Sequence, residues 1–263
     1  MAPVSSRGVV LRTYRLGETS KVVVCYTRDY GKVRLVAKGA RKGGSRFGAA
    51  LEPMMVSGVV FYLKEGRDLH LLSSADIEHD EAALRRDPVR MAYASALVEL
   101  VDRLVPDGEP VRGLEEALEA GLRAAADAPE EDLDALLWRF AMALARRLGY
   151  EPQTGSCVVC GGPPGVGPGF SPLLGGAVCP ECLRNGRAEG AARGDVAALA
   201  LDLARGERVH SIGLEAPLRD DVTDVLLSFL ESHTDRRLKL RSLDFMAQLR
   251  RMNHRTNGTE GQS

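Results

Sequence analysis

Two cysteine pairs lie in the second half of this 263-residue chain, and their spacing limits the possible folds more than any other feature. Two residues separate Cys157 from Cys160, and two residues separate Cys179 from Cys182. Eighteen residues lie between the pairs, which gives the pattern of a four-cysteine zinc site. Each short turn can direct two sulfurs at one ion, and two such turns complete a tetrahedron. Four thiolates leave no position for water, so the pattern predicts one structural zinc ion per chain.

Other uses of these four cysteines stay open at this stage. They could be reduced thiols without a metal, or they could form disulfides or a redox pair. Disulfides are typical of small secreted chains, whereas the first fifteen residues contain no hydrophobic stretch like that of a signal peptide. A redox CxxC motif usually occurs once, beside a βαβ pattern. The fifth cysteine, Cys25, lies in the apolar run 22–26, which favours a buried strand thiol.

Charge is distributed unevenly along a chain whose net charge is only −1. Residues 1–48 contain 11 Lys and Arg against 2 acidic residues, whereas residues 99–134 contain 12 acidic residues against 3 Arg. This asymmetry favours a basic working surface in the N-terminal region. Two ordinary solvated surfaces of opposite sign would give the same composition.

The first 80 residues have the composition of short β-strands bounded by turns. Segments rich in Val, Leu, Tyr and Thr occur at residues 7–15, 19–28, 31–38, 54–64 and 68–74. Five short strands fit a small closed barrel, and the OB-fold is the leading candidate. An SH3-like barrel is the alternative.

Basic residues alternate with apolar ones along segment 31–38. Strand side chains alternate faces, so the apolar Val33, Leu35 and Ala37 are expected inside and the intervening cations outside. The sequence then continues into a loop with the sequence KGARKGGSR, at residues 38–46. Such a surface could neutralise a phosphate backbone. The candidate DNA-binding residues are Arg12, Lys32, Arg34, Lys38, Arg41, Lys42 and Arg46. Candidate base-stacking aromatics are Tyr14, Tyr26, Tyr30, Phe47 and Tyr62.

Apolar residues at helical spacing follow the predicted barrel. In residues 81–150 they predict three helices: one that ends before Pro106, one over 111–127, and one between Pro129 and Gly149. Later in the chain they predict helices over residues 194–206, 217–232 and 239–252. The predicted organisation is an α+β multidomain chain. It consists of a barrel at 1–80, a helical domain in two parts at 81–150 and 191–252, an inserted zinc-binding module at 151–190 and a disordered tail at 253–263. No eighteen-residue apolar run is present, so we expect no membrane span and a cytoplasmic location.

Three segments resemble the RecO recombination mediators of bacterial DNA repair. They are Gly8–Pro53, Arg146–Pro152 and His233–Met246. The resemblance implies an N-terminal OB-fold and a non-enzymatic protein that binds single- and double-stranded DNA and anneals complementary strands. It also implies that the protein, with RecR, helps load RecA onto DNA coated by single-stranded-DNA-binding protein, which would associate it with the nucleoid.

The resemblance further implies that the helical domain binds the acidic tail of single-stranded-DNA-binding protein. Such a tail needs a positive rim beside an apolar pocket. The candidates are Trp138, Arg139, Arg146 and Arg147, with Arg139 and Arg147 expected on roughly the same side of the helix and Arg146 displaced. The alternative is that Trp138 fills the core of the helical bundle while the arginines are solvated.

Two other classes of function compete with this interpretation. A zinc-ribbon transcription regulator would share the cysteines and the basic barrel, but nothing in the sequence resembles a recognition helix. A metal-dependent hydrolase needs an open metal site or carboxylates placed for magnesium. The five histidines are scattered and no HExxH motif occurs, so no catalytic residue is expected.

Overall fold

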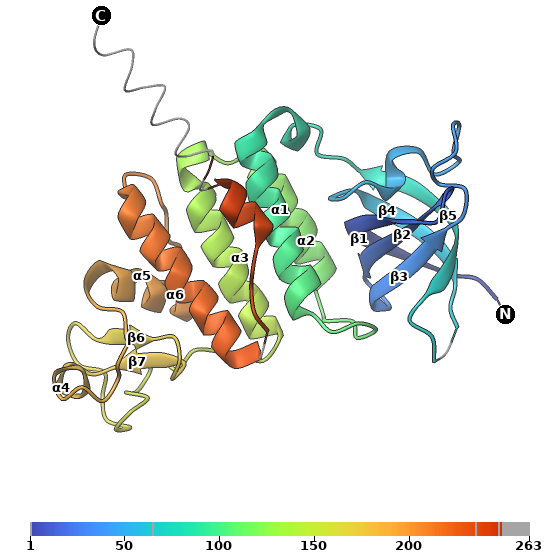
Figure 1. The fold of residues 1–263 in the computed structure, drawn as a ribbon. Coiled ribbons are helices and arrows are strands. Elements are labelled where there is room, and N and C mark those ends of the chain that lie inside the picture. Colours follow the sequence, from blue (N-terminus) through green and yellow to red (C-terminus); the bar gives the residue numbers. More distant parts are fainter. Residues whose placement is uncertain (1, 65, 235, 247, 249–263) are drawn as a thin grey trace, which may run out of the picture. The chain divides into compact units, whose positions relative to one another are not determined.

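The computed structural model describes residues 2–64, 66–234, 236–246 and 248 (Figure 1). The chain forms two compact units. The first contains the residues up to Asp127 together with the segment from Leu240, and the second contains Ala128–Lys239. The tail predicted at 253–263 lies outside the described residues, as does part of the helix predicted at 239–252, of which residues 241–246 are helical. Among the described residues, no helix combines the length and the apolar character needed to cross a bilayer.

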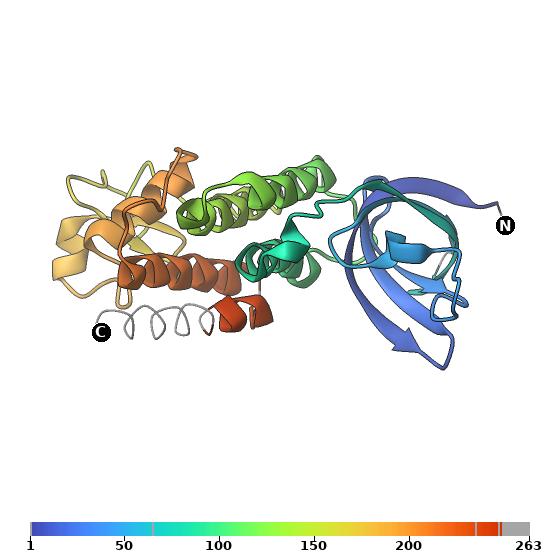
Figure 2. The same ribbon diagram turned by 90° about the horizontal axis from the view of Figure 1, so that it is seen from above.

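The first unit begins with a closed five-stranded barrel. Its strands are β1 (Val4–Leu16), β2 (Ser20–Thr27), β3 (Gly31–Ala37), β4 (Val56–Tyr62) and β5 (His70–His79). They pair in the order β1-β2-β3-β5-β4, and β4 returns to β1 (Figure 2). The β3–β5 pair is parallel and the other pairs are antiparallel. This strand order is that of an OB-fold, which confirms the leading candidate over the SH3-like barrel.

Alternation along the strands fills the barrel. Val33, Leu35 and Ala37 all lie in the buried core cluster, as their period-two spacing predicts. Cys25 is fully buried in the same cluster, and burial, with the nearby charge of Glu115, raises the pKa of its thiol to about 12. Cys25 is therefore a core residue with an inert thiol.

Two helices complete the described core of the first unit. They are α1 (Pro88–Leu104) and α2 (Leu114–Asp127). The side chain of Asp87 caps α1 by accepting hydrogen bonds from the backbone of Val89 and Arg90, and α1 ends before Pro106 as predicted. The C-terminal segment returns to this unit, since the Ser242 hydroxyl donates to Glu99 Oε2 at 2.9 Å.

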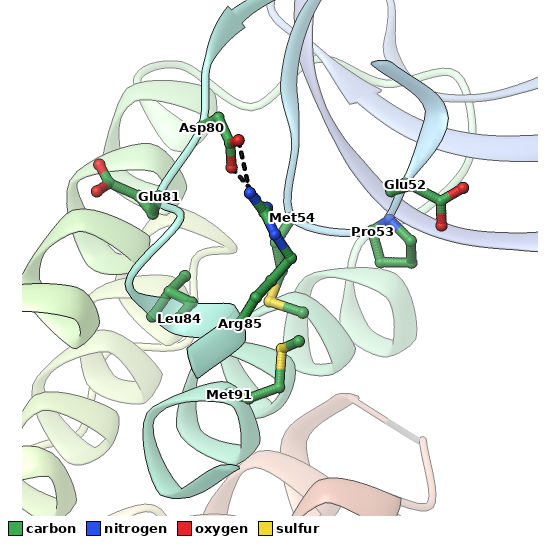
Figure 3. Close-up of a pocket in the computed structure, with 8 residues that line it drawn as sticks. All are labelled: Glu52, Pro53, Met54, Asp80, Glu81, Leu84, Arg85 and Met91. Carbon is green, nitrogen blue, oxygen red and sulfur yellow. Dashed lines mark hydrogen bonds and ion pairs between the residues drawn. The ribbon is translucent and has the colours of Figure 1, made fainter. Parts of the chain in front are cut away.

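A cavity of about 210 Å³ lies in the first unit, between the loop before β4 and the start of α1 (Figure 3). Arg85 crosses it to donate two hydrogen bonds of 2.6 Å to the Asp80 carboxylate. Met54 reaches it from a backbone with φ of 70°, a conformation rarely adopted by residues other than glycine. The charges of Arg85 and Asp80 therefore neutralise each other in the lining of this cavity.

In its described residues, the second unit contains four α-helices and a small hairpin. These are α3 (Leu133–Arg147), β6 (Gly169–Ser171), β7 (Gly176–Val178), α4 (Pro180–Arg184), α5 (Gly194–Arg205) and α6 (Ala216–Thr234). Helix α3 packs against both α5 and α6 (Figure 1). The acidic residues predicted to start α3 instead form a 3-10 turn, Glu130–Asp132, directly before it. The sequence predicted the three long helices but not β6 and β7.

Candidate metal centre and nucleic-acid interface

The first cysteine pair lies on a tight backbone turn. Gly161 donates its N–H to the carbonyl of Cys157 at 2.8 Å, and its φ of 74° requires a glycine-like conformation. Val158 donates to Ala177 of β7 at 2.9 Å, which attaches the turn to the hairpin. These backbone hydrogen bonds hold the turn against the hairpin.

The second pair spans the start of α4. Pro180 occupies the first turn of the helix, where its missing N–H costs nothing, and Cys179 is the N-cap residue. The Sγ of Cys179 accepts a hydrogen bond from Cys182 N at 3.5 Å, and the Sγ of Cys157 accepts one from Cys179 N at 3.3 Å. Such N–H donors stabilise thiolates and orient metal ligands.

The four sulfurs form one cluster. All of them lie within 4.8 Å of one another, and the Cys160 and Cys179 sulfurs are 3.9 Å apart. Four ligands at about 2.3 Å from a central ion would be about 3.8 Å from each other in a tetrahedron. No disulfide links any of the five cysteines, all of which belong to the described residues. The geometry of the cluster fits a four-coordinate metal ion.

The chemistry of the thiols also fits a cation. Burial would raise the pKa of Cys157, but backbone N–H donors from Cys179, Cys160 and Val159 outweigh burial and hold the pKa at about 6. Burial and the surrounding sulfurs raise the pKa of Cys182 to about 12. Four adjacent thiols cannot all ionise on their own, whereas a divalent ion stabilises four thiolates together. Cys157, Cys160, Cys179 and Cys182 could therefore hold a metal ion.

Three of the predicted DNA-binding cations pair with acidic residues of the same unit, and of these only Lys32 is buried. Lys32 is only 8% exposed, and its Nζ donates to the Asp102 carbonyl at 2.6 Å and lies 3.2 Å from the Asp107 carboxylate. Arg34 pairs with Asp107 at 2.7 Å. Arg12 donates from Nε to Asp102 at 2.6 Å. The expected alternation is present, but the end of α1 and the loop after it cover this part of the basic stripe.

The cover has a simple physical cause. On the same outer face, Val24 and Tyr26 are each at most 1% exposed, and the Tyr26 hydroxyl accepts a hydrogen bond from Val111 N at 2.7 Å. A sheet with an apolar outer face must be covered by another layer. The end of α1, the loop after it and α2 supply that layer, and their acidic residues pair with the basic strands, so the two oppositely charged regions partly neutralise each other.

Four predicted DNA-binding cations are exposed together in one loop. They are Lys38, Arg41, Lys42 and Arg46, all in the loop after β3. Arg41 donates to the carbonyls of Gly17 and Glu18 at 3.0 and 2.7 Å, which ties the loop to the β1–β2 turn. Within the described part of the chain, these four cations form no ion pair with an acidic side chain. This basic loop, residues 38–46, is therefore a cationic surface that is open to a ligand.

The aromatic candidates are mostly structural. Tyr26 and Phe47 are buried, and Tyr30 and Tyr62 are half-buried. Tyr14 differs from them because 41% of it is exposed, close to the end of β1. The guanidinium carbon of Arg12 lies 5.5 Å from its ring centroid.

Helix α3 uses its predicted partner-binding residues in different ways. Trp138 is 1% exposed and donates from Nε1 to Thr223 of α6 at 2.8 Å, so it fills the core and is closed to a partner. Arg139 and Arg146 line the same cavity, whereas the exposed Arg147 bonds to the Ala143 carbonyl. Seven residues are close to two helical turns, so Arg146 shares a side with Arg139 and Arg147 is rotated away. This corrects the expected sides of the helix.

The cavity beside α3 has a volume of about 280 Å³, and its lining contains three arginines and one acidic residue, Glu207. Arg146 donates to the carbonyls of Leu203 and Ala204 at the end of α5, at 2.6 and 3.1 Å. Burial lowers the pKa of Arg139, and the nearby charge of Arg208 adds to this effect against the opposing Asp132. Arg139, Arg146 and Arg208 thus surround a space that favours an anionic group; we call it the arginine pocket.

Family comparisons agree with both halves of this architecture. The model named Recombination protein O N terminal matches residues 1–79, and Recombination protein O C terminal matches residues 85–242. The chain belongs to the RecO family. The resemblance inferred from the three sequence segments is thereby confirmed, and the chain is assigned to a family of DNA repair proteins.

Relatives described as "DNA repair protein RecO" match along most of their length. The protein from Symbiobacterium thermophilum is 36% identical over 257 residues, which is 95% of this chain and 99% of the relative. The protein from Anaeromyxobacter dehalogenans strain 2CP-C is 38% identical over 92% of this chain and 95% of its own. The RecO barrel therefore contains the basic loop, and the C-terminal RecO region contains the cysteine cluster and the arginine pocket.

Several residues that shape these RecO sites were absent from the predictions. Asp102, Asp107 and Glu115 pair with barrel cations, and Arg208 completes the arginine pocket. The signal for the first three was the acidic composition of residues 99–134, whose partners lie some 70 to 90 residues away, as for Lys32 and Asp102 or Arg12 and Asp102. Composition alone cannot pair residues across such distances.

Proposed function

We propose that this protein is a DNA-binding recombination mediator that anneals complementary single strands and acts without catalysis. The observation that carries the proposal is the basic loop, residues 38–46, exposed at one end of an OB-fold barrel in a RecO-family chain. The OB-fold commonly binds nucleic acids through such loops and the adjacent strands. A protein with this ligand would act in the cytoplasm, at the nucleoid.

Electrostatics explains how a basic loop promotes annealing. Two strands repel each other through their phosphates, and cations reduce that repulsion without occupying the Watson–Crick edges of the bases. Phosphate contacts carry no sequence information, so complementary strands of any sequence would be accepted. Each neutralised phosphate releases counterions, and binding weakens as salt rises.

A structural zinc ion is proposed for the cysteine cluster. Four sulfur ligands in a tetrahedron are typical of structural zinc sites and leave no position for a reactive water. Zinc would hold the turn at Cys157 against the start of α4 at Cys179. Its role would be to fix the fold of the second unit and to supply no chemistry.

The arginine pocket is the proposed site for the acidic tail of single-stranded-DNA-binding protein. Arg208 is exposed and Arg139 and Arg146 are held by backbone carbonyls, which presents a preformed cationic surface to a carboxylate-rich peptide. With RecR, the protein would use this contact to reach coated DNA and help load RecA.

The decisive experiment measures DNA binding and annealing together. A variant with Lys38→Ala, Lys42→Ala and Arg46→Ala should bind single strands more weakly, and the slope of log affinity against log salt should fall by about 0.7 per lost contact. Annealing of complementary fluorescent oligonucleotides should slow in parallel. Unchanged affinity and slope would contradict the proposal, and a strong preference for one duplex sequence would favour the transcription regulator instead.

The matched control removes the same charge from the same unit. Arg86, Arg103 and Arg112 are exposed cations outside the barrel, and replacing all three by Ala should leave the salt slope close to that of the unaltered protein. Equal losses in both triple variants would show that only net charge matters.

The partner contact is tested separately. Arg208→Glu should weaken binding of an acidic tail peptide while annealing of bare oligonucleotides is retained, because the barrel is untouched. Arg147→Glu is the control. This substitution changes the charge by the same amount, at a position of α3 that does not line the cavity. Loss of tail binding in Arg147→Glu alone would place the contact elsewhere on the helix.

A further inference from the structure

The strand register defines a strip of side chains across the outer face of β1, β2 and β3. Tyr14 of β1 pairs with Val22 of β2, and Val22 pairs with Val36 of β3. Leu16 follows Tyr14 by two residues and therefore lies on the same face. Tyr14 and Leu16 are each 41% exposed, Val36 is half-buried and Val22 is 1% exposed. We call these four residues the apolar strip.

The cover supplied by α1 stops short of the apolar strip. The neighbouring row on the same face consists of Arg12, Val24 and Arg34, which also pair across the three strands. Asp102 and Asp107 hold the two arginines. One row further from α1, the aromatic and apolar side chains remain exposed.

Cations lie on both sides of the apolar strip. On one side, Arg12 approaches the ring of Tyr14 to 5.5 Å. On the other side, Lys38 follows the core residue Ala37 and so projects from the same outer face as Val36, at the start of the basic loop. Arg41 fastens that loop to the turn just beyond Leu16. Three adjacent strands span only about 10 Å, so aromatic surface and cations are within reach of one nucleotide and its neighbours.

We infer that the apolar strip is a stacking platform for unpaired nucleic-acid bases, with Tyr14 as its principal contact. Every base has a π-face, so stacking on Tyr14 is tolerant of sequence, and the cations of the basic loop receive the phosphates of the same strand. Bases inside a duplex are already stacked and cannot use the platform. The site therefore selects single strands over duplex, whereas the basic loop alone binds both. This inference rests on the proposed DNA-binding function and adds the class of strand that the same surface prefers.

The test pairs a change in the protein with a change in the ligand. Fluorescence anisotropy measures binding of a thymine oligonucleotide, an abasic oligonucleotide of equal length, and a duplex, to the full chain and to Tyr14→Ala. Tyr14→Ala should lose about 5-fold or more in affinity for the thymine strand, because base–aromatic stacking contributes about 1–3 kcal/mol per base. Its affinity for the abasic strand and for the duplex should be unchanged.

Two further variants keep the inference open to refutation. Tyr14→Phe keeps the ring and should bind like the unaltered protein. Ile77→Ala removes an equally exposed apolar side chain from β5 of the same barrel and should have no effect. Equal loss on thymine and abasic strands, or no loss on either, would overturn the stacking role while DNA binding stands. If the unaltered protein binds none of the three ligands, the proposed DNA-binding function itself fails.

Discussion

The first unit contains a buried acidic residue, Glu115, whose charge is balanced by cations of the barrel. It is 1% exposed on α2, yet it pairs with Arg7 of β1 and, at 3.0 Å, with Arg28 just after β2. A buried carboxylate is tolerated only when cations and hydrogen bonds replace its water. Arg7 also pairs with Glu119 at 2.8 Å, so its charge is shared within a small network. The network connects the barrel to α2 at a point far from the basic loop.

Removing this carboxylate should destabilise the first unit. Glu115→Ala leaves two guanidinium groups partly unmatched, and we expect a loss of about 2 kcal/mol in the free energy of unfolding, less than for a fully buried pair because both arginines reach solvent. Urea denaturation provides the measurement. Glu116→Ala is the control: Glu116 also contacts Arg28, at 3.1 Å, but is half exposed, so its loss should cost under about 1 kcal/mol. Equal effects would contradict the role of burial.

At the scale of single residues, the sequence predicts metal-ligand candidates and inward-facing positions better than it predicts contacts between distant residues. The four cysteines and the inward positions of β3 follow from spacing alone. The pairing of Lys32 with Asp102 does not, because it depends on where α1 lies against the barrel. Trp138 illustrates the same limit: an aromatic residue beside arginines suggests a binding site, whereas its neighbours in α6 make it a core residue.

Among the elements, the β6–β7 hairpin beside the cysteine cluster was the hardest to predict. Strands β6 and β7 have three residues each, too few to show a period, and lie in a stretch rich in Gly and Pro. The long helices were predicted because ten or more residues repeat an apolar pattern. In the barrel, turn residues between alternating segments gave the strands, and only β5 extends well beyond its predicted end, to His79.

Loss of one cysteine of the four-cysteine cluster should prevent metal binding and destabilise the second unit. Purified Cys157→Ser and Cys179→Ser should contain far less zinc than the expected ratio of about one ion per chain. Both should melt at lower temperature, because metal binding is coupled to folding. Elemental analysis and differential scanning calorimetry are the measurements. Cys25→Ala is the control, since its thiol lies in the barrel core, and it should retain full metal content. Metal-free unaltered protein from non-chelating buffer would contradict the proposal.

Helix α6 contains a repulsion that depends on pH. Desolvation and the charges of Asp220 and Asp221 raise the pKa of Asp224 above its ordinary value. A raised carboxyl pKa in the folded state means that the ionised form is destabilising, and that this penalty disappears as the pH falls through the folded pKa. Asp224→Asn should therefore raise the melting temperature at neutral pH and have little effect near about pH 3, below the ordinary pKa.

A second carboxylate provides the comparison for this prediction. Asp202 of α5 pairs with Arg205 at 3.2 Å, so Asp202→Asn should lower the melting temperature slightly at neutral pH or leave it unchanged. Melting curves between acidic and neutral pH distinguish the two carboxylates. A gain for Asp224→Asn that persists at low pH would mean that charge is not its cause.

For the whole molecule, connectivity matters as much as composition. The chain leaves the first unit after Asp127, forms the entire second unit, and returns at Leu240. The boundaries predicted at residues 80, 150 and 190 follow changes in sequence pattern and stay predictions. A return of the C-terminal segment to α1 leaves no trace in local sequence, because it depends on a contact such as that between Ser242 and Glu99.

This connectivity predicts a difference between the second unit in place and the same residues expressed alone. A fragment of residues 128–239 should keep its metal site but unfold at lower denaturant concentration than in the intact chain. Chemical denaturation followed by Trp138 fluorescence reports on this unit, because Trp138 is the only tryptophan of the chain. Identical midpoints for fragment and intact chain would contradict the prediction.

The reason is an entropic one that acts on the denatured state. While the first unit remains folded, both ends of the inserted segment are anchored, so its unfolded form is a closed loop with fewer conformations than a free chain. Tethering thus stabilises the cysteine-containing unit without adding a contact to it. The anchored loop also stays beside its folding partner after each opening, which favours refolding over aggregation. Insertion between two segments of the folded first unit thus assists the folding of the cysteine-containing unit.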